Sequence, residues 1–269
     1  MAALALFTLL VVACGADGTA HIPVPPALAS RPGNWRLVFH DEFSGSRLNR
    51  DDWTTCYDWN RGGCTNSSSN ELEWYLPGQV SVEGGHLSLT AERRTTPGTD
   101  GQVHPWTSGM ISTGRDHWYA RPRRTFTYGY VEAAIRIPPQ RGMAPQFWLM
   151  PASRYTPPEL DIMESLTSTR EVSMYVHWRN RQGEERQQKG SYTSSGFADR
   201  YHVFAVLWQA DELIWYVDGI ERFRVTDRER IPRVPMEILI NLAVGIKQPP
   251  PSSVDTAQMR VDWVRVWQR

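Results

Sequence analysis

The chain has 269 residues, of which 41% are hydrophobic, and this is enough to form the core of one sizeable domain. Its 29 basic and 29 acidic residues balance, so the charge gives no support for a nucleic-acid partner or an anionic membrane surface. The 12 Trp and 10 Tyr residues stand out, because flat aromatic faces can stack on sugar rings as well as fill a β-sandwich core.

Residues 1–13 are predicted to be a signal peptide of the lipoprotein type. The run from Ala2 to Ala13 is apolar and too short to span a bilayer, although no Lys or Arg precedes it. It leads into Val-Val-Ala-Cys-Gly, which resembles a bacterial lipobox with Cys14 as the lipidated residue. We therefore expect an exported protein, either a cell-surface or periplasmic lipoprotein or a secreted one. Residues 14–33 are rich in proline and are predicted to be a tether.

Two further cysteines, Cys56 and Cys64, lie close together in the sequence. In an exported protein such a pair predicts a local disulfide that closes a loop, whereas in the cytosol both would be free thiols.

Residues 34–269 are predicted to form one all-β domain. Short segments rich in Val, Ile, Tyr, Phe and Trp recur, and long helical periodicity is absent. The expected strands are Trp35–Phe39, His86–Ala91, Gly129–Ile137, Gln146–Met150, Val172–Trp178, His202–Trp208, Leu213–Val217, Ile220–Val225, Glu237–Leu242 and Arg260–Trp267. Asp218-Gly219 between two of them predicts a hairpin turn. This pattern favours a sandwich of two antiparallel sheets, with the polar loop 61–70 and the proline-rich loop 246–253 at the rim of a cleft.

The segment Glu159-Leu160-Asp161-Ile162-Met163-Glu164 carries three carboxylates in six residues. In a strand Glu159 and Asp161 share one face, and a β-bulge at Ile162-Met163 would return Glu164 to that face. Neighbouring carboxylates repel one another and separate their pKa values, as a nucleophile and a general acid require. The alternatives are a solvated strand face, or a cluster that binds a divalent cation.

These residues resemble glycoside hydrolase family 16, in its laminarinase-like branch with the bulged signature. The resemblance runs from about Trp35 to Arg269, and several weaker motifs keep the family order around the hexapeptide. They are Phe39-His40-Asp41-Glu42-Phe43, Asn70-Glu71-Leu72-Glu73-Trp74-Tyr75, Trp106-Thr107-Ser108-Gly109, Tyr128-Gly129-Tyr130-Val131-Glu132-Ala133, Tyr175-Val176-His177-Trp178, Trp215-Tyr216-Val217-Asp218-Gly219, Asn241-Leu242-Ala243-Val244-Gly245 and Val264-Arg265-Val266-Trp267.

The resemblance implies a β-jelly-roll with a concave glycan-binding cleft and a retaining mechanism without a required cofactor. Glu159 would be the nucleophile, Glu164 the acid and base, and Asp161 would hold a hydrogen bond to Glu159. Retaining enzymes place two carboxyls about 5–5.5 Å apart. Same-face neighbours on a strand are roughly 7 Å apart at the backbone, so the side chains must converge.

Further residues are expected to bind substrate by the same resemblance, although each could instead be structural. They are Asn70, His177 and the stacking candidates Trp74, Trp106 and Trp148. A structural calcium ion is expected at Asp262 with a main-chain oxygen near Gly85, the alternative being that Asp262 is an unliganded surface residue.

Three departures from the family pattern bear on the substrate. Pro157-Pro158 replaces a glycine before the signature, Ala144-Pro145-Gln146 stands where relatives have Trp-Pro-Ala, and Gly245-Ile246-Lys247-Gln248 replaces Gly-Gly-x-Trp. The expected function is an endo-glycoside hydrolase that acts on β-1,3- or mixed β-1,3/1,4-glucan, and the protein is expected to be a monomer. The rivals are a galactan hydrolase, a depolymerase or transglycosylase of another polysaccharide, and a glucan-binding module without turnover.

Overall fold

The computed structural model describes residues 22–57 and 63–269. The predicted signal peptide, Cys14 and the first part of the predicted tether lie outside these residues. Within the described ranges, no helix combines the length and the apolar character that crossing a bilayer requires.

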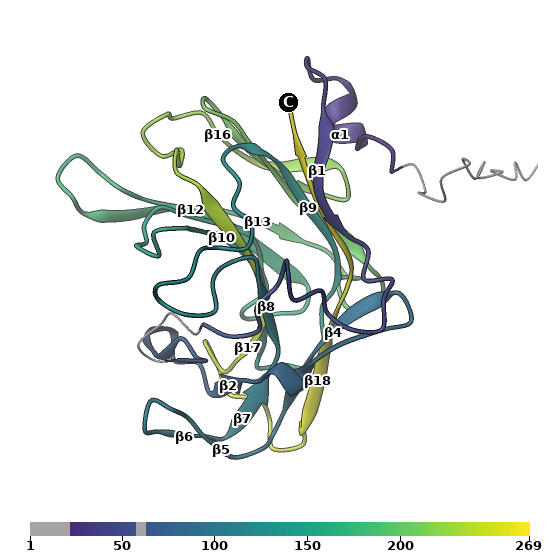
Figure 1. Ribbon diagram of the computed structural model, residues 1–269, viewed down its shortest axis with the longest axis vertical. Helices are drawn as coiled ribbons and strands as arrows, with labels where there is room; N and C mark the ends of the chain where they lie inside the picture. Colours follow the sequence, from purple (N-terminus) through teal and green to yellow (C-terminus); the bar gives the residue numbers. More distant parts are fainter. Residues whose placement is uncertain (1–21, 58–62) are drawn as a thin grey trace, which may run out of the picture.

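Two sheets pack face to face and form the framework of the domain (Figure 1). The larger, sheet A, has the strand order β16-β15-β14-β9-β18-β4-β7-β2, with β1 beside β18 and β3 beside β4. Its strands are β1 Arg36–Asp41, β2 Glu73–Tyr75, β3 Val80–Glu83, β4 His86–Glu92, β7 Trp106–Ser108, β9 Gly129–Arg136, β14 His202–Trp208, β15 Leu213–Val217, β16 Ile220–Val225 and β18 Thr256–Gln268.

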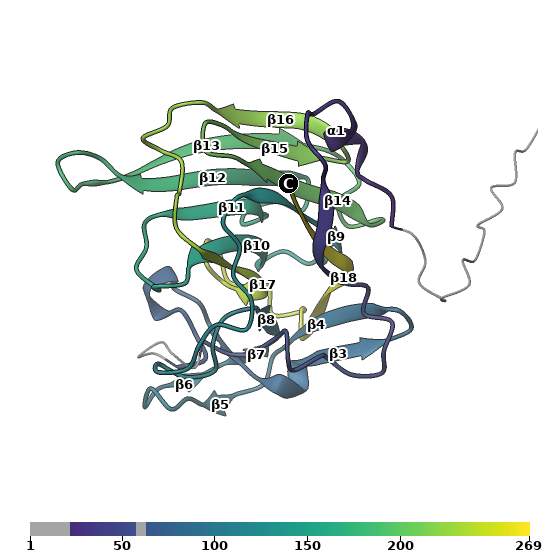
Figure 2. The same ribbon diagram turned by 45° about the horizontal axis from the view of Figure 1, so that its top comes forward.

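Sheet B has the order β13-β12-β11-β10-β17-β8 and carries the hexapeptide as β11, one of its two central strands (Figure 2). Its strands are β8 Met110–Ser112, β10 Met143–Pro151, β11 Glu159–Glu164, β12 Glu171–Arg179, β13 Glu185–Thr193 and β17 Met236–Val244. The short strands β5 Thr96–Pro97 and β6 Val103–His104 form a separate pair, and the helical turns are α1 Pro26–Ala29, η1 Ser67–Ser69 and η2 Pro77–Gln79.

All ten predicted strands are confirmed, with ends that differ by a few residues. The clearest omission was β13, whose sequence Glu-Arg-Gln-Gln-Lys-Gly-Ser-Tyr-Thr is polar on both faces because it lies at the edge of sheet B. The two sheets are antiparallel as predicted, apart from the short strands β2 and β7, which pair in parallel.

The core lies between the sheets and is built from alternate residues of facing strands. Leu160, Ile162 and Met163 of β11 are buried in it, together with Phe147 of β10 and Trp215 of β15. The side chains that alternate with them on sheet B therefore point to the outer, concave face.

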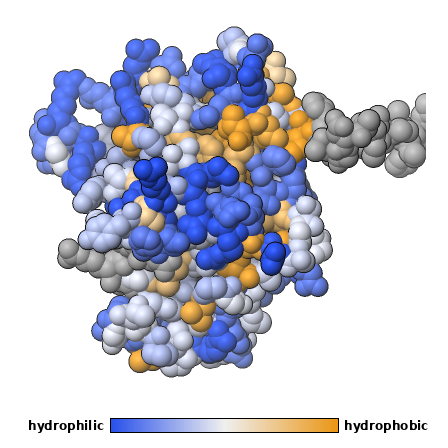
Figure 3. All heavy atoms as spheres, viewed as in Figure 1, coloured by the Kyte–Doolittle hydropathy of each residue, from blue (hydrophilic) through white to orange (hydrophobic). Residues whose placement is uncertain are grey.

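Residues 22–33 correct the tether prediction, because they pack against the domain. Leu28 of α1 is 1% exposed and belongs to a hydrophobic cluster with Tyr130, Leu207 and Trp267 of sheet A. Figure 3 shows hydrophobic residues gathered where the described chain begins. This segment is therefore docked on sheet A. The free energy gained by burying Leu28 and its neighbours outweighs the conformational entropy lost when the segment is fixed.

Two local predictions are confirmed. Cys56 and Cys64 form a disulfide. Asp218 and Gly219 both have positive φ, 53° and 75°, as the tight turn between β15 and β16 requires.

Candidate active site

The bulge in β11 is confirmed from both of its neighbours. Against β12, Asp161 pairs with Tyr175 and Glu164 with Ser173, so three steps on β11 match two on β12. Against β10, the register shifts between Phe147 and Trp148. The extra residue lets Ile162 and Met163 both enter the core, and all three carboxylates share the concave face.

A tryptophan of the opposite sheet holds the bulge from behind. Trp215, which is 0% exposed, donates its indole N–H across the core to the main-chain oxygen of Asp161 at 2.9 Å. A bulge leaves ladder groups without a strand partner, and a buried carbonyl in that state is costly. The indole supplies the missing donor, so Trp215 helps to fix the backbone between the carboxylates.

On the concave face, His177 of β12 joins the carboxylates, as the sequence led us to expect. Its Nε2 shares a hydrogen bond with Asp161 Oδ2 at 2.9 Å and lies 3.8 Å from Glu159 Oε1. We had expected Asp161 to bond Glu159, and its observed partner is His177 instead. Glu159 and His177 line a cavity of about 310 Å³, with side chains 24% and 27% exposed. Ligand atoms of Glu159, Asp161 and His177 lie within 4.8 Å of one another, so the trio also has the spacing of a divalent-cation site.

Burial and mutual repulsion raise the pKa values of these carboxyl groups. Burial, followed by the charge of Asp161, raises the pKa of Glu159 to about 8, while His177 lowers it. Burial and Glu164 raise the pKa of Asp161 well above its usual value. Burial also raises the pKa of Glu164, against the lowering influence of Gln146, His177 and Lys247.

A pKa near 8 would leave Glu159 largely protonated at neutral pH, whereas attack on a sugar requires the carboxylate. Asp161 offers the better place for a proton, because its side chain is only 4% exposed and is bonded to His177. The Asp161–His177 pair is electrically neutral whether the shared proton rests on Oδ2 or on Nε2. A neutral pair no longer repels Glu159, which can then ionise.

A chain of directed hydrogen bonds ends on Glu164. The indole of Trp148 can only donate, and it bonds Asn241 Oδ1 at 2.8 Å. The amide nitrogen of Asn241 therefore points to Gln146 Oε1 at 2.7 Å and to the Tyr75 hydroxyl at 2.9 Å. With its oxygen so occupied, Gln146 presents its nitrogen to Glu164 Oε1 at 2.6 Å.

The two loops predicted at the rim do approach this face. Cys64 of loop 61–70 packs against a cluster that includes Tyr75 and Trp148. Tyr57, next to the disulfide partner Cys56, has its ring centroid 5.7 Å from that of Tyr75 and 6.5 Å from that of Trp148. Loop 246–253 brings Lys247 close enough to lower the pKa of Glu164. These loops border the concave floor on the side of β17.

Two of the predicted stacking residues do not offer an open face. Trp106 is 1% exposed and belongs to the core between the sheets. Trp74 is 5% exposed, with the His104 ring 5.0 Å away and Gly63 and Gly98 packed against it. Both lie on sheet A, where the aromatic content fills the sandwich. Trp148 does lie on the concave face, as part of its floor.

Asn70 and Asp262 are placed without a demonstrated ligand role. Asn70 is exposed at the end of η1 with φ of 60°, the conformation of a turn residue. Asp262 is the extra residue of a bulge in β18, and burial and Glu42 raise its pKa, while Arg265 and His86 lower it. A half-buried carboxyl beside another acid suits a bound cation, but Arg265 already supplies positive charge there. The calcium site at Asp262 and Gly85 stays a prediction.

Comparison with known proteins decides the family. Residues 68–265 match the family model described as glycosyl hydrolases family 16. The chain belongs to this family. It is 31% identical over 255 residues to the endo-1,3-1,4-beta-glycanase EglC of Rhizobium meliloti, covering 86% of this chain and 51% of that protein. It is 30% identical to a beta-glucanase of Rhodothermus marinus, covering 87% of this chain and 85% of that one.

The solved structures agree with this assignment. The endo-beta-1,3-glucanase from Pyrococcus furiosus has a TM-score of 0.74 and 30% identity, covering 87% of this chain and 94% of that chain. The jelly-roll fold expected for family 16 is thereby confirmed. The chain spans about half the length, 51%, of the two Rhizobium meliloti glycanases that it matches.

Three residues of the site had no role assigned from the sequence. All three were placed in expected strands; in addition, Gln146 was noted as part of a departure from Trp-Pro-Ala, and Asn241 and Trp215 as parts of family motifs. The period-two pattern of β10 would have placed Gln146 on the same face as Trp148. Nothing in the sequence alone pairs Trp215 with the bulge, because that contact crosses between two sheets.

Proposed function

We propose that residues 34–269 form the catalytic domain of a retaining, endo-acting glycoside hydrolase for β-1,3- or mixed β-1,3/1,4-glucan. The observation that carries the proposal is the bulge that puts Glu159, Asp161 and Glu164 on one concave face, with Glu159 opening into a cavity. The substrate class is supported by the relatives, which are named as beta-glucanases and endo-1,3-1,4-beta-glycanases.

The proposed reaction has two displacements. The Glu159 carboxylate attacks the anomeric carbon while Glu164 gives its proton to the departing glycosidic oxygen, so one C–O bond forms as another breaks. Glu164 is then a carboxylate, and it takes a proton from water as the water oxygen attacks the same carbon. This second step releases Glu159 and restores the proton on Glu164.

The neighbouring groups set the charge state for these steps. The neutral Asp161–His177 pair lets Glu159 ionise without a second full charge beside it. Gln146 holds the Glu164 carboxyl at a fixed angle through a bond to one of its oxygens. The trio that could ligate a cation is needed here as nucleophile and charge partner, and the mechanism uses no metal.

The first test is release of reducing ends from a panel of β-glucans and galactans by the wild type and by Glu159→Gln. We expect turnover of a β-glucan by the wild type and a loss of at least about a thousandfold in the variant. Glu185→Gln is the matched control, because Glu185 lines the same cavity from β13 with a side chain 65% exposed. Undiminished turnover by Glu159→Gln would refute the assignment of the nucleophile.

The same experiment separates the rivals. Turnover of galactan alone would replace the proposed substrate, and retention on glucan without any wild-type turnover would indicate a binding module. Products longer than the starting oligosaccharide would indicate transglycosylation. Azide added to Glu159→Ala should restore cleavage and yield a glycosyl azide of inverted configuration, which identifies the nucleophile directly.

Export is part of the proposal. The apolar run at residues 2–13, the lipobox-like sequence at Cys14 and the Cys56–Cys64 disulfide support a cell-surface or periplasmic lipoprotein. Labelling of expressing cells with a radioactive fatty acid tests this: incorporation into the full chain and none into Cys14→Ser is expected. Equal labelling of both would exclude Cys14 as the lipidated residue.

A further inference from the structure

Three aromatic side chains are exposed in the described part of the chain, and all belong to two loops next to the catalytic strand. Trp118 is 44% exposed, Tyr119 is 91% exposed and Tyr155 is 71% exposed. Trp118 and Tyr119 lie in loop 113–128 after β8, and Tyr155 lies in loop 152–158, which leads directly into Glu159. Large aromatic residues are costly to expose, and a contiguous group of them indicates a binding surface.

Arg154 of loop 152–158 contacts both the backbone and the ring of Trp118 in loop 113–128. Its Nη1 donates to the main-chain oxygen of Trp118 at 3.0 Å, and its guanidinium lies 3.9 Å from the centroid of that ring. Arg154 itself has φ of 66°, a conformation that side chains rarely adopt. One face of the indole is thus covered by the guanidinium, while much of the side chain stays open to solvent.

The loops are anchored on the concave side of sheet B. Glu237 of β17 is 0% exposed and pairs with Met150, next to the Leu149–Leu160 pair that adjoins Glu159. Arg115 approaches Glu237 at 3.9 Å, and Arg115 and Arg154 both lower its pKa, which burial raises to about 7. Glu237 therefore lies two strands from Glu159, roughly 10 Å across the sheet.

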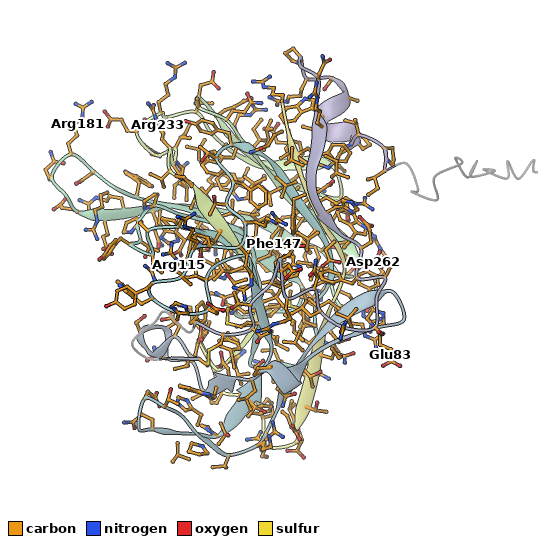
Figure 4. The ribbon with its side chains drawn as sticks, in the orientation of Figure 1. Glu83, Arg115, Phe147, Arg181, Arg233 and Asp262 are labelled. Atoms are coloured by element: carbon orange, nitrogen blue, oxygen red, sulfur yellow. A yellow bond between two sulfur atoms is a disulfide. The ribbon has the colours of Figure 1, made fainter. Side chains whose placement is uncertain are left out.

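Arg115 lies on the sheet B side of the core and links the two loops. Figure 4 shows Arg115 and Asp262 on opposite sides of the buried Phe147, Arg115 with sheet B and Asp262 with sheet A. Arg115 also donates to the main-chain oxygen of Ala152, so each loop is tied to the other. The exposed aromatic residues accordingly stand at the Glu159 end of the concave face.

We propose that Trp118, Tyr119 and Tyr155 form an additional sugar-binding subsite that extends the catalytic cleft beyond Glu159. This inference rests on the proposed function and concerns how far along the glycan the domain reaches. The occupant is a pyranose of the same chain, whose C–H face packs on the free side of the Trp118 indole.

Continuity with the catalytic cavity favours a glycan as the occupant. Thr156, Pro157 and Glu159 line that cavity, and Tyr155 directly precedes them in the chain. Trp74 and Trp106, which were expected to stack on sugar rings, are buried, so any such stacking must come from other aromatic side chains. A preformed, flat and partly polar surface of this kind is typical of ligand sites that fix orientation at low entropic cost.

The test compares Trp118→Ala with Trp263→Ala on β-glucan oligosaccharides of increasing length. Trp263 is the matched control, because it lies in β18 of sheet A and is also covered by an arginine, Arg265, at 3.9 Å. For Trp118→Ala we expect KM to rise about tenfold for long oligosaccharides and polymer, with kcat/KM unchanged for the shortest cleaved substrate. Trp263→Ala should resemble the wild type at every length, and Tyr119→Ala should follow Trp118→Ala.

The outcomes distinguish the two proposals. Wild-type turnover with no length-dependent change in either loop variant would overturn the subsite and leave the proposed function intact. Absence of β-glucan turnover in the wild type would overturn the proposed function itself. Affinity electrophoresis of Glu159→Gln in gels containing the glucan, with and without Trp118→Ala, then reports binding alone, and equal mobility of both variants would again overturn the subsite.

Discussion

Gln146 donates its side-chain amide to Glu164 Oε1 at 2.6 Å, and Asn241 decides which end of that amide faces the acid. The direction is set at Trp148, whose indole can only donate and so claims the oxygen of Asn241. An N–H bond stabilises the ionised carboxyl more than the neutral one. Gln146 thus limits how far burial raises the pKa of Glu164.

Replacement of Gln146 by alanine should therefore move one limb of the pH profile. Without the donor the pKa of Glu164 rises further, and since Glu164 must be protonated for the first displacement, the alkaline limb of kcat/KM shifts to higher pH. We also expect kcat/KM for an ordinary glucan to fall about tenfold, because the acid is less well oriented. Initial rates across a range of pH measure both effects.

Two comparisons isolate the role of Gln146. A substrate with a dinitrophenyl leaving group needs little protonation, so Gln146→Ala should cleave it almost as fast as the wild type. Gln258→Ala serves as the control, because Gln258 is a half-buried glutamine of β18 on sheet A. An alkaline limb that stays in place or moves down in Gln146→Ala would contradict the assigned direction.

Loss of His177 should act on the opposite limb. His177 lowers the pKa of Glu159 and bonds Asp161, so His177→Ala leaves Glu159 beside an unpaired Asp161 and raises its pKa further above about 8. Because Glu159 must be ionised to attack, the acidic limb of kcat/KM shifts to higher pH. The expected loss is about a hundredfold at pH 6 and smaller at pH 9.

The control for His177→Ala is His40→Ala, an exposed histidine on β1 whose side chain is 51% exposed. It should leave both limbs where they are. A loss in His177→Ala that is the same at every pH would mean that the imidazole contacts substrate and does not govern ionisation of the carboxylates.

The stability of the fold should also depend on a buried acid far from the site. Glu132 of β9 is 3% exposed, and burial raises its pKa to about 7 from 4.5, although the Trp267 indole donates to it. Its neutral form is thus favoured in the folded state, a contribution fully present below pH 4.5 and lost as pH rises through about 7. Glu132→Gln should stabilise the domain by about 3 kcal/mol at pH 8 and by almost nothing at pH 4.

Urea unfolding of both proteins at the two pH values measures this difference. Glu83→Gln is the control, because Glu83 is exposed on β3 and should change the free energy of unfolding by little at either pH. A gain in Glu132→Gln that is equal at pH 4 and pH 8 would point to a change in packing and exclude titration of Glu132 as the cause.

The sequence predicted much of this site because its key feature is local. Spacing along one strand places Glu159, Asp161 and Glu164, and the burial of both Ile162 and Met163 requires the bulge between Asp161 and Glu164. Strands with strong apolar alternation were also predictable. The polar edge strand β13 was not, since its pairing with β12 compensates for a sequence without a hydrophobic face.

What the sequence left open depends on contacts between distant segments. The sequence could not distinguish Trp74 and Trp106 from cleft residues, because a tryptophan in a strand can face either the core or a bound sugar. The roles of Gln146 and Asn241 need the pairing of β10 with β17, which brings residues far apart in the chain into one hydrogen-bonded row. The docking of Leu28 was missed because the proline content shows how stiff this segment is and does not show which surface it packs against.

The contact between Trp215 and the bulge gives the most selective prediction. Trp215→Phe removes the donor to the Asp161 carbonyl and leaves that buried oxygen unpaired, at a cost of about 1–3 kcal/mol. The freed backbone lies between Glu159 and Glu164, so we also expect kcat to fall about tenfold as the carboxyls lose their fixed separation. Thermal unfolding and steady-state kinetics on the same samples measure the two effects.

Trp208 provides a closely matched control. It too is 0% exposed in sheet A, and its indole donates to a main-chain oxygen, that of Pro232, at 2.8 Å. Trp208→Phe should therefore lose similar stability while keeping the wild-type kcat, because Pro232 does not lie between the carboxylates. Equal losses of kcat in the two variants would show that the activity responds to core stability in general. A loss confined to Trp215→Phe would show that an indole on one sheet sets the geometry of catalysis on the other.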